Sequence, residues 1–150
     1  MLSGVAALAI PAYFERSEIT LENACVLLAK DLRAAQNRSA YMGEPALFTF
    51  FAEEDRYEVF DAFGDRIRNP TTMQPFVREY PFDGVFQGVE IVEVDFGPDA
   101  TLIFDKRGVA LEGGSVVLAF RGDRRRVVVT KESGRIVLEG STSEWTDDGM

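Results

Sequence analysis

Carboxylates are the commonest side chains in this sequence that could do chemistry, and histidine is absent. Acid–base catalysis needs two carboxylates in one pocket, with pKa values that differ. Neither the runs Glu53-Glu54-Asp55 and Asp147-Asp148 nor the pair Glu90 and Glu93 has a spacing that indicates such a pocket, and solvated turns or faces explain them. Without histidine, the usual partner of a Ser or Cys nucleophile and the commonest zinc ligand are missing. We therefore predict no enzymatic activity, no metal site and no cofactor.

One basic cluster stands out in a chain of 150 residues whose formal net charge is −9. It consists of Arg121, Arg124, Arg125 and Arg126. One interpretation is a phosphate or DNA contact at the tip of a hairpin. The other is a turn whose solvated arginines discourage edge pairing. We favour the second and do not expect nucleic acid as a partner, because nucleic-acid binding needs a basic face and this chain is acidic.

The elements that must position these residues begin with an uncharged, mainly apolar segment, residues 2–14. A membrane-spanning helix needs about 20 apolar residues, so this segment is too short to cross a bilayer by itself. It lacks the basic start and the small-residue cleavage site of a secretory signal. Composition alone, with 46% hydrophobic residues and twelve phenylalanines, favours a folded domain.

A helical pattern follows, from about residue 12 to Met42. Apolar residues recur at helical spacing, at Leu21, Ala24, Cys25, Leu28, Leu32 and Ala35. We expect Leu21, Cys25, Leu28 and Leu32 to dock on the β-sheet, with Cys25 as a small buried hydrophobic residue. Gly43 and Pro45 end the pattern. Two starts stay open: Pro11 in the first turn, or a helix that begins upstream and passes through Pro11 with a kink. A break around residues 17–20 also stays open.

After Pro45 the pattern changes to that of strands. A long loop from Gly64 to Gly88 is expected, with one short strand near Glu79–Phe82. Turn residues at 121–124 and 132–134 predict that the last three strands form an antiparallel meander. The predicted strands are Ala46–Phe51, Arg56–Phe60, Val89–Phe96, Thr101–Asp105, Ser115–Phe120, Arg126–Lys131 and Arg135–Glu139.

The predicted fold class is therefore α+β, a long N-terminal helix packed on an antiparallel β-sheet domain. We divide the chain into an N-terminal helix (residues 1–43), a β-rich globular domain (44–140) and an acidic mobile tail (141–150).

Several segments together resemble the type IV pilins and pseudopilins. Residues Ala6–Tyr13, with the sequence AALAIPAY, resemble the second half of the N-terminal helix of those proteins, in which an apolar helix contains a proline, then a small residue and often an aromatic one. Residues 28–40 are similar to the helix of the GspH/FimT group, which has a leucine–acid–leucine–arginine stretch with alanines. Residues 103–108, with the sequence IFDKRG, and Gly134-Arg135-Ile136 resemble the closing β-region of that group.

This resemblance implies a structural protein with a pilin-like fold, a minor pseudopilin or pilin of a type II secretion or type IV pilus-like filament. Its partners would be other pilins or pseudopilins. It would lie in the bacterial inner membrane as a single-pass protein before assembly, with the globular domain in the periplasm or outside the cell. The resemblance implies that these side chains pack in the filament or the membrane: Leu2, Val5, Leu8, Ile10, Pro11 and Tyr13.

The families it resembles carry a basic leader, a cleavage point, an N-methylated first residue and an early glutamate. None of these is in the sequence, and we expect them to lie before Met1. The alternative function is a FimT-like minor pilin that binds DNA for natural transformation. Two features count against it: Gly134-Arg135-Ile136-Val137 lacks a second arginine, and the tail is acidic.

Overall fold

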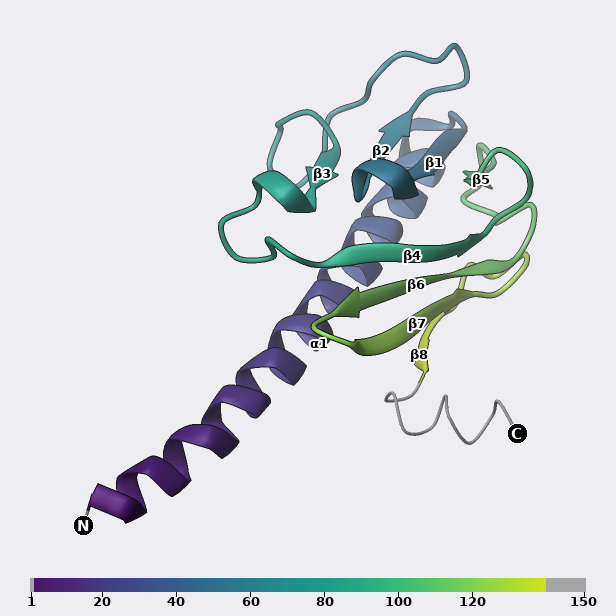
Figure 1. Ribbon diagram of the computed structural model, residues 1–150. Helices are drawn as coiled ribbons and strands as arrows, with labels where there is room; N and C mark the ends of the chain where they lie inside the picture. The colour runs from purple at the N-terminus through teal and green to yellow at the C-terminus, as the bar shows by residue number, and fades with distance from the viewer. Residues whose placement is uncertain (1, 140–150) are drawn as a thin grey trace.

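The computed structural model describes residues 2–139, with side chains from Ile19 onward, and Figure 1 shows its course. One helix is followed by eight strands and two short 3-10 turns, η1 and η2. The elements are α1 (Leu2–Met42), β1 (Ala46–Phe51), η1 (Ala52–Glu54), β2 (Arg56–Phe60), β3 (Val77–Glu79), η2 (Tyr80–Phe82), β4 (Glu90–Asp95), β5 (Thr101–Phe104), β6 (Gly114–Phe120), β7 (Asp123–Val129) and β8 (Ile136–Glu139).

The helix α1 is continuous over 41 residues, so it passes through Pro11, and no break occurs at residues 17–20. At 1.5 Å per residue its length is about 60 Å. Its N-terminal half extends beyond the strands (Figure 1). Gly43 follows the helix with φ +67°, the left-handed conformation expected of a glycine just after a helix end.

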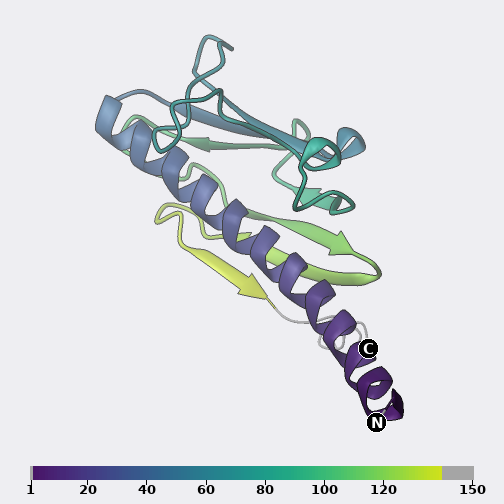
Figure 2. The same ribbon diagram turned by 90° about the vertical axis from the view of Figure 1, so that its left-hand side faces the viewer.

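The strands form two four-stranded sheets in which every pair of strands is antiparallel. The first sheet has the order β3-β2-β1-β5 and the second the order β4-β6-β7-β8. The second half of α1 lies across both sheets (Figure 2). The predicted meander of the last three strands is confirmed as β6-β7-β8, while the division into two sheets goes beyond the sequence-based prediction.

The limits of the seven strands predicted outside the long loop agree with the structure to within one residue, except for those of β7. It begins at Asp123, three residues earlier than predicted, and ends at Val129 instead of Lys131. The reason is the hairpin turn, which contains only Arg121 and Gly122. Both have positive φ, 52° and 89°, as a two-residue type I′ turn requires. Arg124 therefore belongs to the strand and not to the turn.

In the long loop, the short strand lies two to three residues earlier than predicted. The short strand expected near Glu79–Phe82 is β3, Val77–Glu79, and the next three residues form η2. Pro81 lacks the N–H that a strand ladder needs, which favours the 3-10 turn at this point.

The core lies between α1 and the two sheets. Phe50 of β1 and Phe96 after β4 stack with their ring centroids 5.5 Å apart and an interplanar angle of 6°, which joins the sheets. Strand β1 alternates buried and half-buried residues along its length, because successive side chains of a strand point to opposite faces of the sheet. The division at residues 43 and 140 stays a prediction, and the tail 141–150 lies outside the described residues.

Candidate functional site: the helix–sheet junction

The inner face of α1 attaches the β-domain to the helix. Leu21 is 2% exposed, and Cys25, Leu28 and Leu32 are completely buried, which confirms the predicted docking face. A fully buried aliphatic side chain of this size contributes about 1.5–3 kcal/mol relative to an exposed one. The helix is thus held to the sheets over several turns of its second half.

Gln36 fixes this half of the helix to both sheets at once. Its Nε2 donates to the carbonyl oxygen of Gly108, which follows β5, and to that of Ser133, between β7 and β8, at 2.9 Å each. Gly108 and Gly134 have φ +81° and +68°. At either glycine an added Cβ would come close to Gln36. Both turns therefore approach the helix so closely that a larger residue would have to displace its neighbours.

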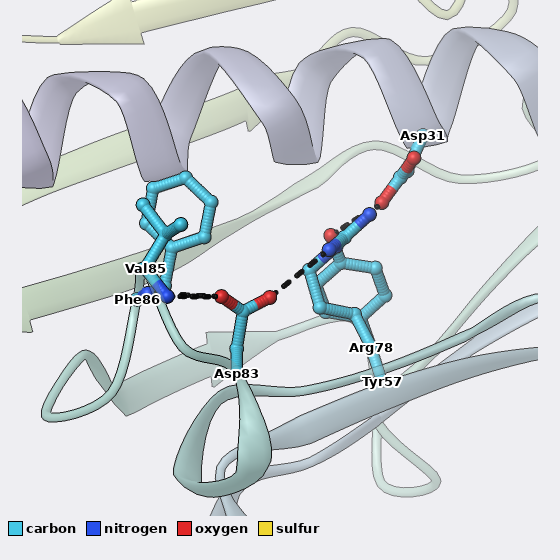
Figure 3. A network of polar contacts seen from close by, with 6 residues as sticks. All are labelled: Asp31, Tyr57, Arg78, Asp83, Val85 and Phe86. Carbon is cyan, nitrogen blue, oxygen red and sulfur yellow. Dashed lines mark hydrogen bonds and ion pairs between the residues drawn. The ribbon is translucent and has the colours of Figure 1, made fainter.

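A buried polar network joins α1 to the first sheet, as Figure 3 shows. Asp31 is 6% exposed. Its Oδ2 accepts a 2.6 Å hydrogen bond from the Tyr57 hydroxyl of β2 and a 3.2 Å hydrogen bond from Nε of Arg78 in β3. Arg78 also binds Asp83 through Nη1 at 3.4 Å, and Oδ1 of Asp83 accepts from two backbone N–H groups of the following loop. The network thus links the helix, two strands and a loop.

Burial controls the ionisation of this network. It raises the pKa of Asp31, although the Tyr57 hydrogen bond and the Arg78 charge act in the opposite direction. It also raises the pKa of Tyr57 well above its usual value. A carboxyl with a raised pKa is a candidate for acid–base catalysis where a substrate can reach it. Asp31 is instead enclosed between the helix and the sheet, so the network positions elements of the fold.

The four arginines of the basic cluster do not share one face. Arg125 alternates with the buried Val127 and Val129 and therefore points toward α1, where its charge acts on Cys25. Arg124 and Arg126 project from the opposite face of β7. Nη2 of Arg126 lies 3.9 Å from Oε2 of Glu93 in β4, and the Arg121 guanidinium lies 5.1 Å from the centroid of the Phe120 ring. A DNA contact through this cluster stays the less favoured interpretation, and the strand divides its residues between two surfaces.

The residues predicted to pack in a filament or membrane all belong to the half of α1 that extends beyond the strands (Figure 1). They are Leu2, Val5, Leu8, Ile10, Pro11 and Tyr13, and since their side chains lie outside the described part, their packing stays a prediction. Over the residues that the structure describes, no helix is both long and apolar enough to span a membrane. In the same part of the chain, no three His, Cys, Asp or Glu side chains gather in a way that could hold a metal ion.

The sequence-based reasoning missed the polar network. One signal was available, because Asp31 falls at helical spacing between Leu28 and Ala35 and so belongs to the inner face. Its partners Tyr57 and Arg78 lie 26 and 47 residues further along the chain, where no local pattern indicates a contact with the helix.

This architecture, a long N-terminal helix whose second half packs across antiparallel sheets, is the pilin-like α+β fold. The minor pseudopilin EpsH from the type 2 secretion system of Vibrio cholerae is similar, with a TM-score of 0.60 and 12% identity over 80% of this chain and 96% of that chain. The type IV minor pilin FimU from Pseudomonas aeruginosa PAO1 is also similar, with a TM-score of 0.57 and 15% identity over 87% of this chain and 94% of that chain.

These two structures confirm the predicted fold class, and they support the pilin-like resemblance at the level of the fold. No protein-family model and no curated protein matches the sequence.

Proposed function

We propose that this chain is a minor pseudopilin or minor pilin, a structural subunit that enters a type II secretion or type IV pilus-like filament through its N-terminal helix. One observation carries the proposal. The second half of α1 holds the β-domain, while the first half, which includes the uncharged residues 2–14, extends beyond every strand (Figure 1).

An uncharged, mainly apolar helix segment outside its own domain is unfavourable in water. It is stabilised in lipid or in a bundle of similar helices. Small residues let neighbouring helices approach closely, and the segment contains Gly4, Ala6, Ala7 and Ala9. Contacts of this kind that do not close on themselves generate a filament. The inner membrane would hold the same segment before assembly, with the β-domain on the periplasmic or extracellular side.

The similar structures support this role, since one is described as a minor pseudopilin and the other as a minor pilin. The role is structural, and the buried network around Asp31 fits it, because a subunit needs its helix and its domain in a fixed relation. The particular secretion or pilus system would be identified by the genes that accompany the chain.

The proposal is tested by site-specific photo-crosslinking in the bacterium that encodes the chain. The chain is expressed there from its native gene. A photoreactive amino acid in place of Leu8 should crosslink to the major pilin or pseudopilin, and the chain should appear in the sheared filament fraction. The matched control places the same amino acid at the exposed Glu53, on the β-domain. A chain missing from the filament fraction, with no more crosslinking from position 8 than from position 53, would overturn the proposal.

A further inference from the structure

A basic groove lies between the second half of α1 and the loop from β2 to β3, the loop at the top of Figure 1. Its volume is about 1060 Å³. Five basic side chains line it, against the single acidic Asp61: Lys30, Arg33, Arg38, Arg66 and Arg68. The rest of the chain has eleven basic and twenty-four acidic residues. An acidic protein therefore places five of its sixteen basic residues in one hollow.

Two of the three charges on the helix side of the groove have no partner among the described residues. Lys30 and Arg33 are exposed, and neither forms a hydrogen bond or ion pair with any residue in the described part of the chain. Arg38 has a buried Nη1 without a hydrogen-bond acceptor, and its ion pair with Glu44 is long, at 3.9 Å. Lys30 and Arg33 therefore keep their donors available for an anionic partner, while Arg38 adds positive charge beside them.

The loop side of the groove is held in place. Nη1 of Arg68 donates to the backbone oxygen of Met73 at 2.7 Å, and Nε of Arg66 lies 2.6 Å from Oε2 of the buried Glu58. The Arg66 side chain is nevertheless 67% exposed. The loop thus places two guanidinium groups in the same groove as Lys30 and Arg33 of the helix.

Large apolar side chains are exposed among these charges. Tyr41 is 90% exposed, Met73 61% and Met42 51%, and all three line the groove. Tyrosine and methionine are enriched in the centres of protein interfaces, and the methionine side chain adapts to partners of different shape. The groove thus combines anion-binding groups with an apolar contact surface.

We propose that this groove docks an acidic segment of a partner protein, an extended peptide with several carboxylates and at least one large apolar side chain. Guanidinium groups bind carboxylates through paired hydrogen bonds. An apolar side chain of the peptide would cover Tyr41 and Met73. This site is separate from residues 2–14, on which the proposed filament role depends, so either can fail without the other.

Charge and position favour a peptide over other anions. Lys30 lies 16 residues after Phe14, the end of the uncharged segment, which is about 24 Å along the helix axis. A lipid headgroup at that segment would be more than two Debye lengths away at physiological salt. Nucleic acid carries closely spaced charge and needs a basic surface, whereas the chain outside this groove has more than twice as many acidic as basic residues.

Fluorescence anisotropy with the full chain tests the proposal. The probes are two fluorescein-labelled peptides of equal length, one of glutamate alone and one with phenylalanine at every third position. The second should bind more tightly, because it also buries apolar surface. The variant Lys30→Glu/Arg33→Glu should weaken both by at least about tenfold. Tyr41→Ser should weaken mainly the phenylalanine-containing peptide.

The matched control is Arg121→Glu/Arg124→Glu, which makes the same charge change at the other basic cluster and should leave the affinity within about twofold. Circular dichroism and thermal unfolding verify that each variant is folded. A further variant, Lys30→Gln/Arg33→Gln, removes the two charges without reversing them. Three results would overturn the proposal: neither peptide binds, both double charge reversals weaken binding equally, or a single-stranded oligonucleotide of equal charge binds more tightly in a way that depends on Lys30 and Arg33.

Discussion

The hydroxyl of Tyr57 donates a 2.6 Å hydrogen bond to the buried carboxylate of Asp31, and this bond ties the long helix to an interior strand of the first sheet. Arg78 binds the same carboxylate oxygen from the neighbouring strand. Since the same helix extends beyond the strands at its other end, this contact fixes the orientation of the β-domain relative to the projecting segment. Its strength is therefore relevant to both folding and assembly.

Removing either partner of this bond should destabilise the fold. Tyr57→Phe deletes the donor and should lower the free energy of unfolding by about 1–3 kcal/mol. Asp31→Ala should cost about 3 kcal/mol, because it also leaves Arg78 without its buried partner. Urea unfolding followed by circular dichroism measures both. Glu53→Ala, at an exposed position of η1, is the control and should change stability by less than about 0.5 kcal/mol. A Tyr57→Phe variant as stable as the parent would show that the bond makes no net contribution.

The raised pKa of Asp31 predicts a specific pH dependence. Burial raises this pKa above its ordinary value of 3.8, so the folded chain holds the proton more tightly than the unfolded chain. The associated stability is complete below pH 3.8 and is lost as the pH rises through the folded pKa. The difference in unfolding free energy between the parent and Asp31→Asn, taken as parent minus variant, should therefore fall as the pH rises from about 3 toward neutrality.

Urea unfolding of both proteins at several pH values in that range gives this difference directly. The amide at position 31 does not titrate, so the contributions of all other titrating groups cancel to first order in the difference between the two proteins. If the difference instead grew with pH, the Tyr57 hydrogen bond and the Arg78 charge would outweigh burial.

Cys25 should be protected from alkylation as long as the chain is folded. Burial is the main reason that its pKa rises from 9.0 to about 12, and the thiolate is the reactive form. At pH 8 the native thiol should react with iodoacetamide at least about a thousandfold more slowly than in urea, as measured by mass spectrometry. The raised pKa also means that stability declines relative to Cys25→Ala as the pH rises above 9.0. Equal alkylation rates in the folded and unfolded chains would contradict the burial of this helix face.

Local periodicity was sufficient for the elements of the fold. The helix face at Leu21 and Leu28 follows from a repeat that a few residues display. The arrangement of the strands does not follow in this way. Strands β4 and β5 are neighbours along the chain, yet they belong to different sheets. Their pairing depends on contacts between distant residues, such as the stacking of Phe50 on Phe96.

The same limit applies to the sites. Asp31 could be assigned to the inner face of the helix from its spacing, but Tyr57 and Arg78 could not be identified as its partners. In the basic groove, Lys30 and Arg33 follow helical spacing, whereas Arg66 and Arg68 lie in an irregular loop more than thirty residues later. Only the folded chain brings those two pairs of charges together.

Asp55 should prove to be the one important carboxylate of the acidic run 53–55. Its Oδ1 accepts a 2.9 Å hydrogen bond from the backbone N–H of Ile91 in β4, so it joins the two sheets. It also adopts φ 51°, which Asn tolerates better than Ala. Asp55→Ala should lower the free energy of unfolding by about 1–3 kcal/mol, and Asp55→Asn by clearly less. Thermal and urea unfolding measure both variants, with Glu54→Ala as the exposed control. Equal stability of the two Asp55 variants would contradict the prediction.

A comparison of two glycines isolates the contribution of Gln36. Gly122 and Gly134 both have positive φ, 89° and 68°, so alanine at either position should cost about 1–2 kcal/mol of backbone strain. At Gly122 an added Cβ meets open space, whereas at Gly134 it meets the Gln36 side-chain amide. Displacing that amide would break its two hydrogen bonds to turn carbonyls, each of which contributes about 1 kcal/mol to the free energy of unfolding.

Gly134→Ala should therefore be more destabilising than Gly122→Ala by about 1–2 kcal/mol in urea unfolding. In a Gln36→Ala background the two glycine variants should cost nearly the same, because neither the clash nor the bonds exist there. An excess cost at Gly134 that persisted without Gln36 would mean that the turn between β7 and β8 is constrained by something other than its contact with the helix.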